Sequence, residues 1–160
     1  MEPLLELARM VEQSRPATAI RMVPWLYPAL MALHVLGIAL LVGGAAAFDA
    51  RLLGLARREV PLAGAARLLL PLSRAGFALT LVTGLAMAAA MAGTVVQSAA
   101  APVKFGLLLL AGVNVLVFHA RVLPGLPAGG AVPGAARLCA LASLVLWTGI
   151  TFAGRWLAYA

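Results

Sequence analysis

The residue of this sequence best suited to chemistry is His34, an imidazole inside a long apolar run. Between Met22 and Phe48 it is the only side chain that titrates near neutral pH. A run of this length can cross a bilayer, which needs about 20 residues. Because a titratable group is costly at membrane depth, a functional role is the first hypothesis for it. His34 is therefore our leading candidate for a ligand.

Methionine sulfur atoms are expected near His34. Met31 lies three residues earlier, on the same face of a helix. If the next apolar run returns antiparallel, Met87 and Met91 reach about the depth of His34. A neutral imidazole with thioethers is a soft ligand set that suits Cu(I) or a His–Met haem iron. In the structural alternative, His34 donates to a carbonyl or threonine of a neighbouring helix, and the methionines fill apolar gaps.

His119, Lys104 and Arg155 are further candidates for cofactor binding. His119 lies about 13 Å deeper than His34 at 1.5 Å per residue, so we expect no single haem to take both histidines. It could serve a second site or be an ordinary interfacial residue. Lys104 and Arg155 come at the same end as His34 and could pair with haem propionates or another anion. Anchoring at lipid headgroups explains both equally well.

The composition indicates a membrane protein. Of the 160 residues, 64% are hydrophobic and 11% are charged, whereas soluble domains carry about 25% charged residues. A net charge of +7 would suggest nucleic acid in a soluble chain. Here the arginines stand at the ends of apolar runs, where they meet lipid headgroups, so we expect no nucleic acid partner. The single cysteine, Cys139, excludes an internal disulfide and a cysteine metal cluster.

The apolar runs predict an all-α fold, a four-transmembrane-helix bundle in a single domain over residues 1–160. We expect the spans at about 24–48, 73–94, 103–122 and 136–157. An amphipathic helix over 2–14 is too short and too charged to span, and is expected to lie along the membrane surface. Glycines and prolines between 124 and 134 predict a loop.

The distribution of basic residues predicts the orientation. Two loops are basic, one after the first span and one after the third, and the loop near 94–101 has no basic residue. The basic residues of these two loops are Arg51, Arg57, Arg58, Arg67, Arg74, Arg121 and Arg137. The positive-inside rule then puts these loops in the cytoplasm and both termini outside, in the inner membrane of a bacterium.

Small and polar residues predict how the helices pack. The stretch from Gly84 to Gly93 carries small residues four apart and is expected at a tight helix contact, within the bundle or with another membrane protein. Asn114 is expected to form a hydrogen bond between helices. Asp49 stands unfavourably near a helix C-terminus, so we expect a cationic partner, with Arg74 and Arg137 as the candidates.

Several short motifs resemble a known family. They are Trp25-Leu-Tyr-Pro28, His34-Val-Leu-Gly37, Asp49-Ala-Arg-Leu-Leu-Gly54, Gly76-Phe77, Thr83-Gly84, Lys104-Phe105, Asn114 and Gly154-Arg155. In this order they resemble a bacterial family of small four-helix membrane proteins with no assigned function, over residues 14–160. The chain departs from the family in having Ala50 where leucine is usual. The family is more distantly similar to copper-resistance D membrane proteins and b-type cytochrome bundles, which implies a metal or haem.

Together these observations lead to one favoured function and two alternatives. The favoured one is a membrane redox or metal-handling module that binds haem b or copper through His34 in the outer leaflet. One alternative is a structural or accessory subunit without a cofactor, which would bind a second copy or a partner membrane protein through small-residue helix faces. The other is a small-solute or proton pathway lined by His34 and Asn114. We expect no enzymatic activity of the chain on its own.

Overall fold

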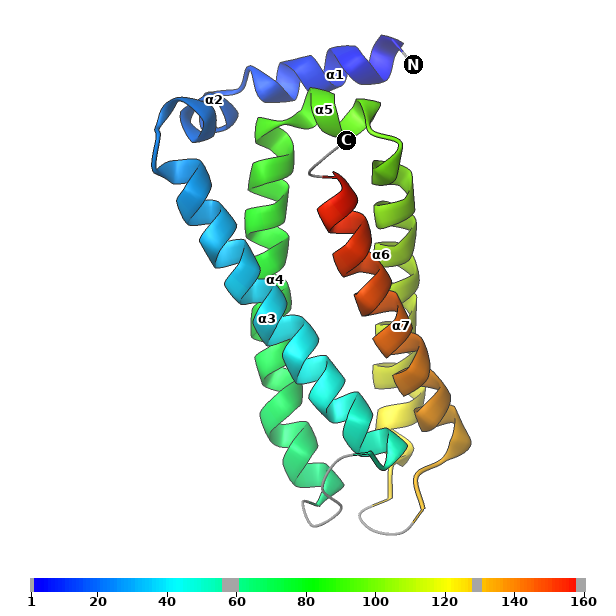
Figure 1. Ribbon diagram of the computed structural model, residues 1–160. Coiled ribbons are helices and arrows are strands. Elements are labelled where there is room, and N and C mark those ends of the chain that lie inside the picture. The colour runs from blue at the N-terminus through cyan, green and yellow to red at the C-terminus, as the bar shows by residue number, and fades with distance from the viewer. Residues whose placement is uncertain (1, 56–60, 128–130, 158–160) are drawn as a thin grey trace.

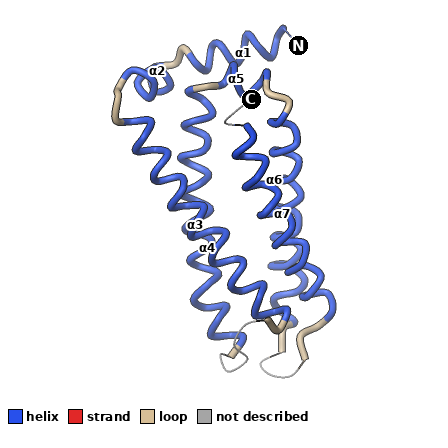
Figure 2. The backbone as a smooth tube through the Cα atoms, viewed as in Figure 1, coloured by secondary structure: helices blue, strands red, loops and turns tan. Residues whose placement is uncertain are grey.

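The computed structural model describes residues 2–55, 61–127 and 131–157, which form helices joined by short turns and loops, with no strand among them (Figures 1 and 2). Four helices are long and apolar enough to cross a membrane. They are α3 (Leu26–Leu53), α4 (Leu62–Ala90), the continuous stretch Ala100–Gly125, and α7 (Gly134–Leu157). The protein is thus a multi-pass membrane protein with an all-α bundle, as the sequence predicted.

The four long helices form two antiparallel hairpins. α3 packs most extensively against α4, and α6 (Ala100–Val117) packs against α7. The hairpins meet through α3 and α7, whereas α4 and α6 share no extensive contact within the described residues. Figure 1 shows α3 and α7 diverging toward the end of the bundle where the N-terminal helices lie. We call this the upper end, and the end with the α3–α4 connection the lower end.

The core lies in the middle and lower parts of the bundle. Its middle cluster centres on Leu41, Ala111 and Trp147. Its lower cluster includes Phe48 and Phe118, whose rings meet edge to face with centroids 5.9 Å apart. Most other large apolar side chains on the spans are exposed, which suits a surface that faces lipid rather than water.

The backbones of α3 and α4 approach closely where glycines replace larger residues. A Cβ atom at Gly37 would lie 2.5 Å from Oγ1 of Thr80, and one at Gly44 would lie 2.5 Å from Oγ of Ser73. At Gly76 it would collide with the backbone nitrogen of Leu41. Lipid tails are as apolar as the side chains, so the hydrophobic effect does not drive helices together in a membrane. Helix pairs there depend on such close packing.

Two spans differ from their predicted bounds. α4 begins at Leu62 rather than near 73, because Arg67 and Arg74 are exposed on the helix and do not break it. It ends at Ala90, and a short helix, α5 (Ala92–Gln97), follows after a bend at Met91. α6 continues through a π-helical turn, η1 (Phe118–Val122), and a 3-10 turn, η2 (Leu123–Gly125). Arg57 and Arg58 of the predicted basic loop lie outside the described residues.

The helix predicted over 2–14 is present, and a second short helix that was not predicted follows it. α1 (Glu2–Glu12) and α2 (Arg15–Met22) meet at Ser14, and α1 lies across α5 at the upper end (Figure 1). Arg21 connects them to the bundle by donating 2.9 Å to the carbonyl of Ala90 and 2.6 Å to that of Glu12. The Ala90 carbonyl ends α4 and would otherwise lack a helical partner.

Substitution at Gly76 should weaken the bundle. We expect Gly76→Ala to destabilise the protein by about 1–3 kcal/mol, the range for overpacking a close contact, because the added methyl group meets backbone atoms that cannot yield. Gly43→Ala on α3 is the matched control, since a Cβ atom there meets nothing within 4 Å. Thermal unfolding in detergent measures both. Equal stability of the two variants would contradict the close approach of α3 and α4.

Candidate functional site

His34 lies on the upper half of α3, half-buried, with its ring against α4. A Cβ atom at Gly84 would lie 2.9 Å from Cε1 of His34. Only glycine therefore leaves space for the imidazole at this height on α4. The ring and the α4 backbone are in direct contact, and Gly84 forms the surface on which the ring rests.

Thr83 favours a proton on Nδ1 of His34, and the backbone of Thr80 also forms a hydrogen bond with the ring. Nδ1 of His34 lies 2.9 Å from Oγ1 of Thr83, and this hydroxyl also lies 2.7 Å from the carbonyl oxygen of Leu79. The single hydroxyl proton goes to the carbonyl, which cannot donate. Nδ1–H of His34 must then donate to Oγ1, and the neutral ring keeps its lone pair on Nε2. Partners of this kind orient metal-binding histidines in proteins.

Lys104 and Gly154 bring the second hairpin to the same site. The ammonium nitrogen of Lys104 would lie 3.6 Å from a Cβ atom at Gly154, so this side chain crosses from α6 to the α7 backbone. Its positive charge also acts on His34. Arg155 follows on α7 and is exposed. His34, Gly84, Lys104 and Gly154 thus come from all four long helices, and we call them the upper polar site.

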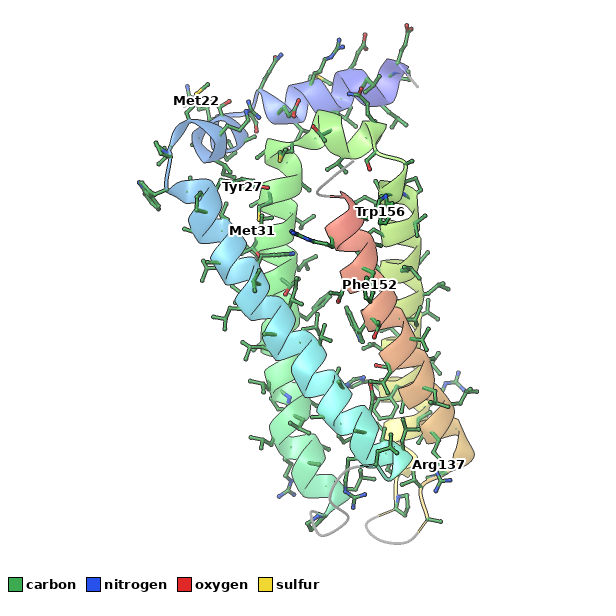
Figure 3. All side chains as sticks on the ribbon, in the orientation of Figure 1. Met22, Tyr27, Met31, Arg137, Phe152 and Trp156 are labelled. Atoms are coloured by element: carbon green, nitrogen blue, oxygen red, sulfur yellow. The ribbon has the colours of Figure 1, made fainter. Side chains whose placement is uncertain are left out.

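The methionines predicted as ligands are only partly brought together with His34. Because His34 meets Thr83 and Gly84, Met87 lies one turn above this level on α4 and Met91 two turns above it. The sulfur of Met91 accepts a hydrogen bond from Tyr27, at 3.6 Å. The prediction that both methionines share the depth of His34 was thus one to two turns off. Met31 is 39% exposed, on the upper half of α3 (Figure 3).

His119 lies far from the upper polar site. It stands on η1, and its Nδ1–H donates to the carbonyl of Val115 at 2.9 Å, which leaves Nε2 buried without a partner among the described residues. Its neighbour Phe118 contacts Phe48, which is 14 residues beyond His34 on α3, or about 21 Å at 1.5 Å per residue. This separation agrees with the expectation that one haem does not take both histidines.

Two predicted helix contacts have different outcomes. Asn114 donates 3.1 Å to the carbonyl of Cys139 on α7, so the hydrogen bond expected between helices is confirmed. Asp49 hydrogen-bonds Ser143 rather than Arg74 or Arg137, both of which are exposed. Figure 3 shows Arg137 at the lower end of α7 and Trp156 at its upper end. The prediction of a cationic partner was wrong for these two arginines, because their long side chains extend outward from the bundle.

Sequence reasoning named a threonine of a neighbouring helix as a partner of His34 in the structural alternative but did not identify Thr83. The hydroxyls of Thr83 and Thr151 also bond to carbonyls of their own helices. Only the register between α3 and α4 shows that Thr83 also meets His34. The motif Thr83-Gly84 could have indicated it, because a hydroxyl next to a residue without a side chain offers both a partner and space for a ring.

The fold and this site define an integral membrane four-helix bundle with a polar group at one end. The chain belongs to a family of unknown function, DUF6644, whose model matches residues 26–160. No curated protein and no solved structure matches the chain. The more distant similarity to copper-resistance D proteins and b-type cytochromes stays a prediction.

The Thr83 contact makes a prediction about the protonation of both histidines. In ¹⁵N-histidine NMR of the neutral protein, His34 and His119 should both show the Nδ1–H form, since each Nδ1 faces an acceptor. Thr83→Val removes the acceptor and should release His34 to a mixture of tautomers. His119 is the internal control and should not change. A wild-type His34 with its proton on Nε2 would contradict the assignment.

Proposed function

We propose that this protein is a membrane redox or metal-handling module in which Nε2 of His34 binds haem b or copper. The orientation of His34 by Thr83 is the observation that carries the proposal. The same contact would serve the structural alternative, in which His34 donates to a threonine of a neighbouring helix; the ligand proposal rests in addition on the lone pair that this orientation leaves on Nε2. The hydroxyl of Thr83 donates its own proton to the carbonyl of Leu79, so it accepts a hydrogen bond from Nδ1–H of His34. Nε2 is then able to act as a ligand.

The residues around His34 fit each cofactor in a different respect. The ammonium of Lys104 would pair with a haem propionate, and Met87, one turn above Thr83 on α4, is the better placed methionine for a second ligand. The close contact between α3 and α4 suits a small ion held between neighbouring helices, such as Cu(I). Repulsion by Lys104 would amount to a few kcal/mol at an effective dielectric of about 20, so it does not decide against copper.

Each cofactor would contribute chemistry that side chains do not provide. Bound haem or copper would supply one-electron transfer, while His34 would act as ligand and Thr83 would hold its ring in position. Lys104 would compensate negative charge beside the ring, with Arg155 as a further candidate for that task. Met31 and Met91 would need to change side-chain conformation to reach the same centre.

The visible spectrum and the metal content of the purified protein test this proposal. For haem, we expect a Soret band that His34→Ala abolishes and His119→Ala leaves in place. For copper, we expect about one equivalent without a Soret band, again lost in His34→Ala. Gly84→Ala should weaken either centre, because the added methyl group displaces the ring.

Two results would overturn the proposal. One is a protein without haem or metal after expression with both supplied, and the other is a centre that survives His34→Ala. A cofactor-free protein that purifies with a second membrane subunit would instead favour the accessory role. Uptake of a solute or protons into vesicles, lost in His34→Ala and Asn114→Ala, would favour a pathway.

We further propose that the protein lies in a bacterial inner membrane with the upper end, and hence both termini, outside. The support is that Arg67, Arg74, Arg121 and Arg137 lie toward the lower end, as the positive-inside rule requires of the cytoplasmic side. In a Cys139→Ser background, Ser14→Cys should react with a membrane-impermeant thiol reagent in intact spheroplasts. Gly125→Cys should react only after lysis, and the reverse pattern would contradict this orientation.

A further inference from the structure

A second polar group lies in the lower half of the bundle, at Asp49. It is the only aspartate in the chain and is 7% exposed. Its neighbours on α3, Phe48 and Leu52, belong to the lower core cluster. His34 is about 22 Å away along α3 at 1.5 Å per residue. Asp49 therefore does not belong to the upper polar site, and the proposed function does not use it.

The Asp49 carboxyl has fewer partners than an ionised carboxylate needs. Ser143 on α7, itself 7% exposed, supplies one side-chain hydrogen bond. The other oxygen, Oδ2, is buried and has no hydrogen-bond partner among the described residues. An ionised carboxylate offers about four acceptor positions, and burying it is costly unless it is paired and hydrogen-bonded. One hydroxyl group does not meet this requirement.

The charged groups around Asp49 lie toward the surface. Among the described residues they are Arg51 on α3, Arg67 and Arg74 on α4, His119 and Arg121 on η1, and Arg137 on α7, while Arg57, Arg58 and Glu59 lie outside the described residues. The arginines of α4, η1 and α7 are exposed, and Arg51 is half-buried. His119 gives its Nδ1 proton to its own helix. Within residues 2–55, 61–127 and 131–157, Ser143 is the one side chain that hydrogen-bonds this carboxyl.

We propose that Asp49 is a proton-binding site, a carboxylic acid that holds its proton at pH values at which a free aspartate is ionised and stabilises the contact between α3 and α7 in that form. A bound proton removes the charge without requiring further ligands. A metal cation such as Ca²⁺ would need about six to eight oxygen ligands, whereas the described surroundings offer a carboxyl and one hydroxyl. Loss of the proton would leave a charge within the contact that joins the two hairpins.

NMR of a single labelled carbon can test this proposal directly. Because Asp49 is the only aspartate, ¹³C-carboxyl aspartate places one carboxyl label in the chain, and Asp49→Asn identifies its signal. We expect the chemical shift of a protonated acid at about pH 5, whereas a free aspartate is ionised above about pH 4. Ser143→Ala should move the signal. Ser73→Ala is the control, since Ser73 bonds within its own helix and should leave the signal unchanged.

Stability as a function of pH gives a second measurement. If the folded state holds a proton that the unfolded state releases, the wild-type melting temperature should fall as pH rises. Asp49→Asn is neutral at every pH and should not show this fall. An ionised Asp49 signal at about pH 5 would overturn the proposal, as would a signal that follows Na⁺ concentration instead of pH. Neither measurement depends on a cofactor at His34, so the two proposals can fail separately.

Discussion

The close approach of the α3 and α4 backbones is the constraint on which the upper half of the structure depends. Glycines at 37, 44 and 76 remove the side chains that would otherwise hold the two helices apart. Contact at this distance brings the hydroxyl of Thr83 within 2.9 Å of Nδ1 of His34 and places the ring on Gly84. Nδ1 of the imidazole therefore has a hydrogen-bond partner inside the helix pair and does not need water. Burying this polar group in lipid without a partner would be costly.

Each described polar contact between long helices has a different structural task. His34 and Thr83 connect α3 with α4, inside the first hairpin. Asn114 and the carbonyl of Cys139 connect α6 with α7, inside the second. The hydrogen bond between Asp49 and Ser143 is the one that joins the hairpins, through α3 and α7. Since a hydrogen bond between membrane helices contributes about 0.6 kcal/mol on average, packing must provide most of the stability and these bonds mainly fix the register.

The sequence predicted the four spans and their antiparallel order, because about 20 apolar residues between charged ends have few other solutions. It did not predict that α4 starts at Leu62, since a helix that leaves the hydrocarbon tolerates arginines on its exposed side. His34 was identified because an imidazole is conspicuous among apolar residues. Thr83 was not, because its contact with His34 depends on a register set by backbone contacts at distant glycines.

The upper polar site differs from the rest of the bundle in how its two halves are connected. In the middle and lower parts, Trp147 and Ser143 of α7 pack against α3 through Leu41 and Asp49. Toward the upper end the two helices diverge (Figure 1), and the charge of Lys104 still acts on His34 from the second hairpin. A ligand that takes Nε2 of His34 and compensates Lys104 would add a connection between the hairpins where the described helices pack least. Binding of such a ligand would thus depend on the distance between α3 and α7, which packing in the lower core sets.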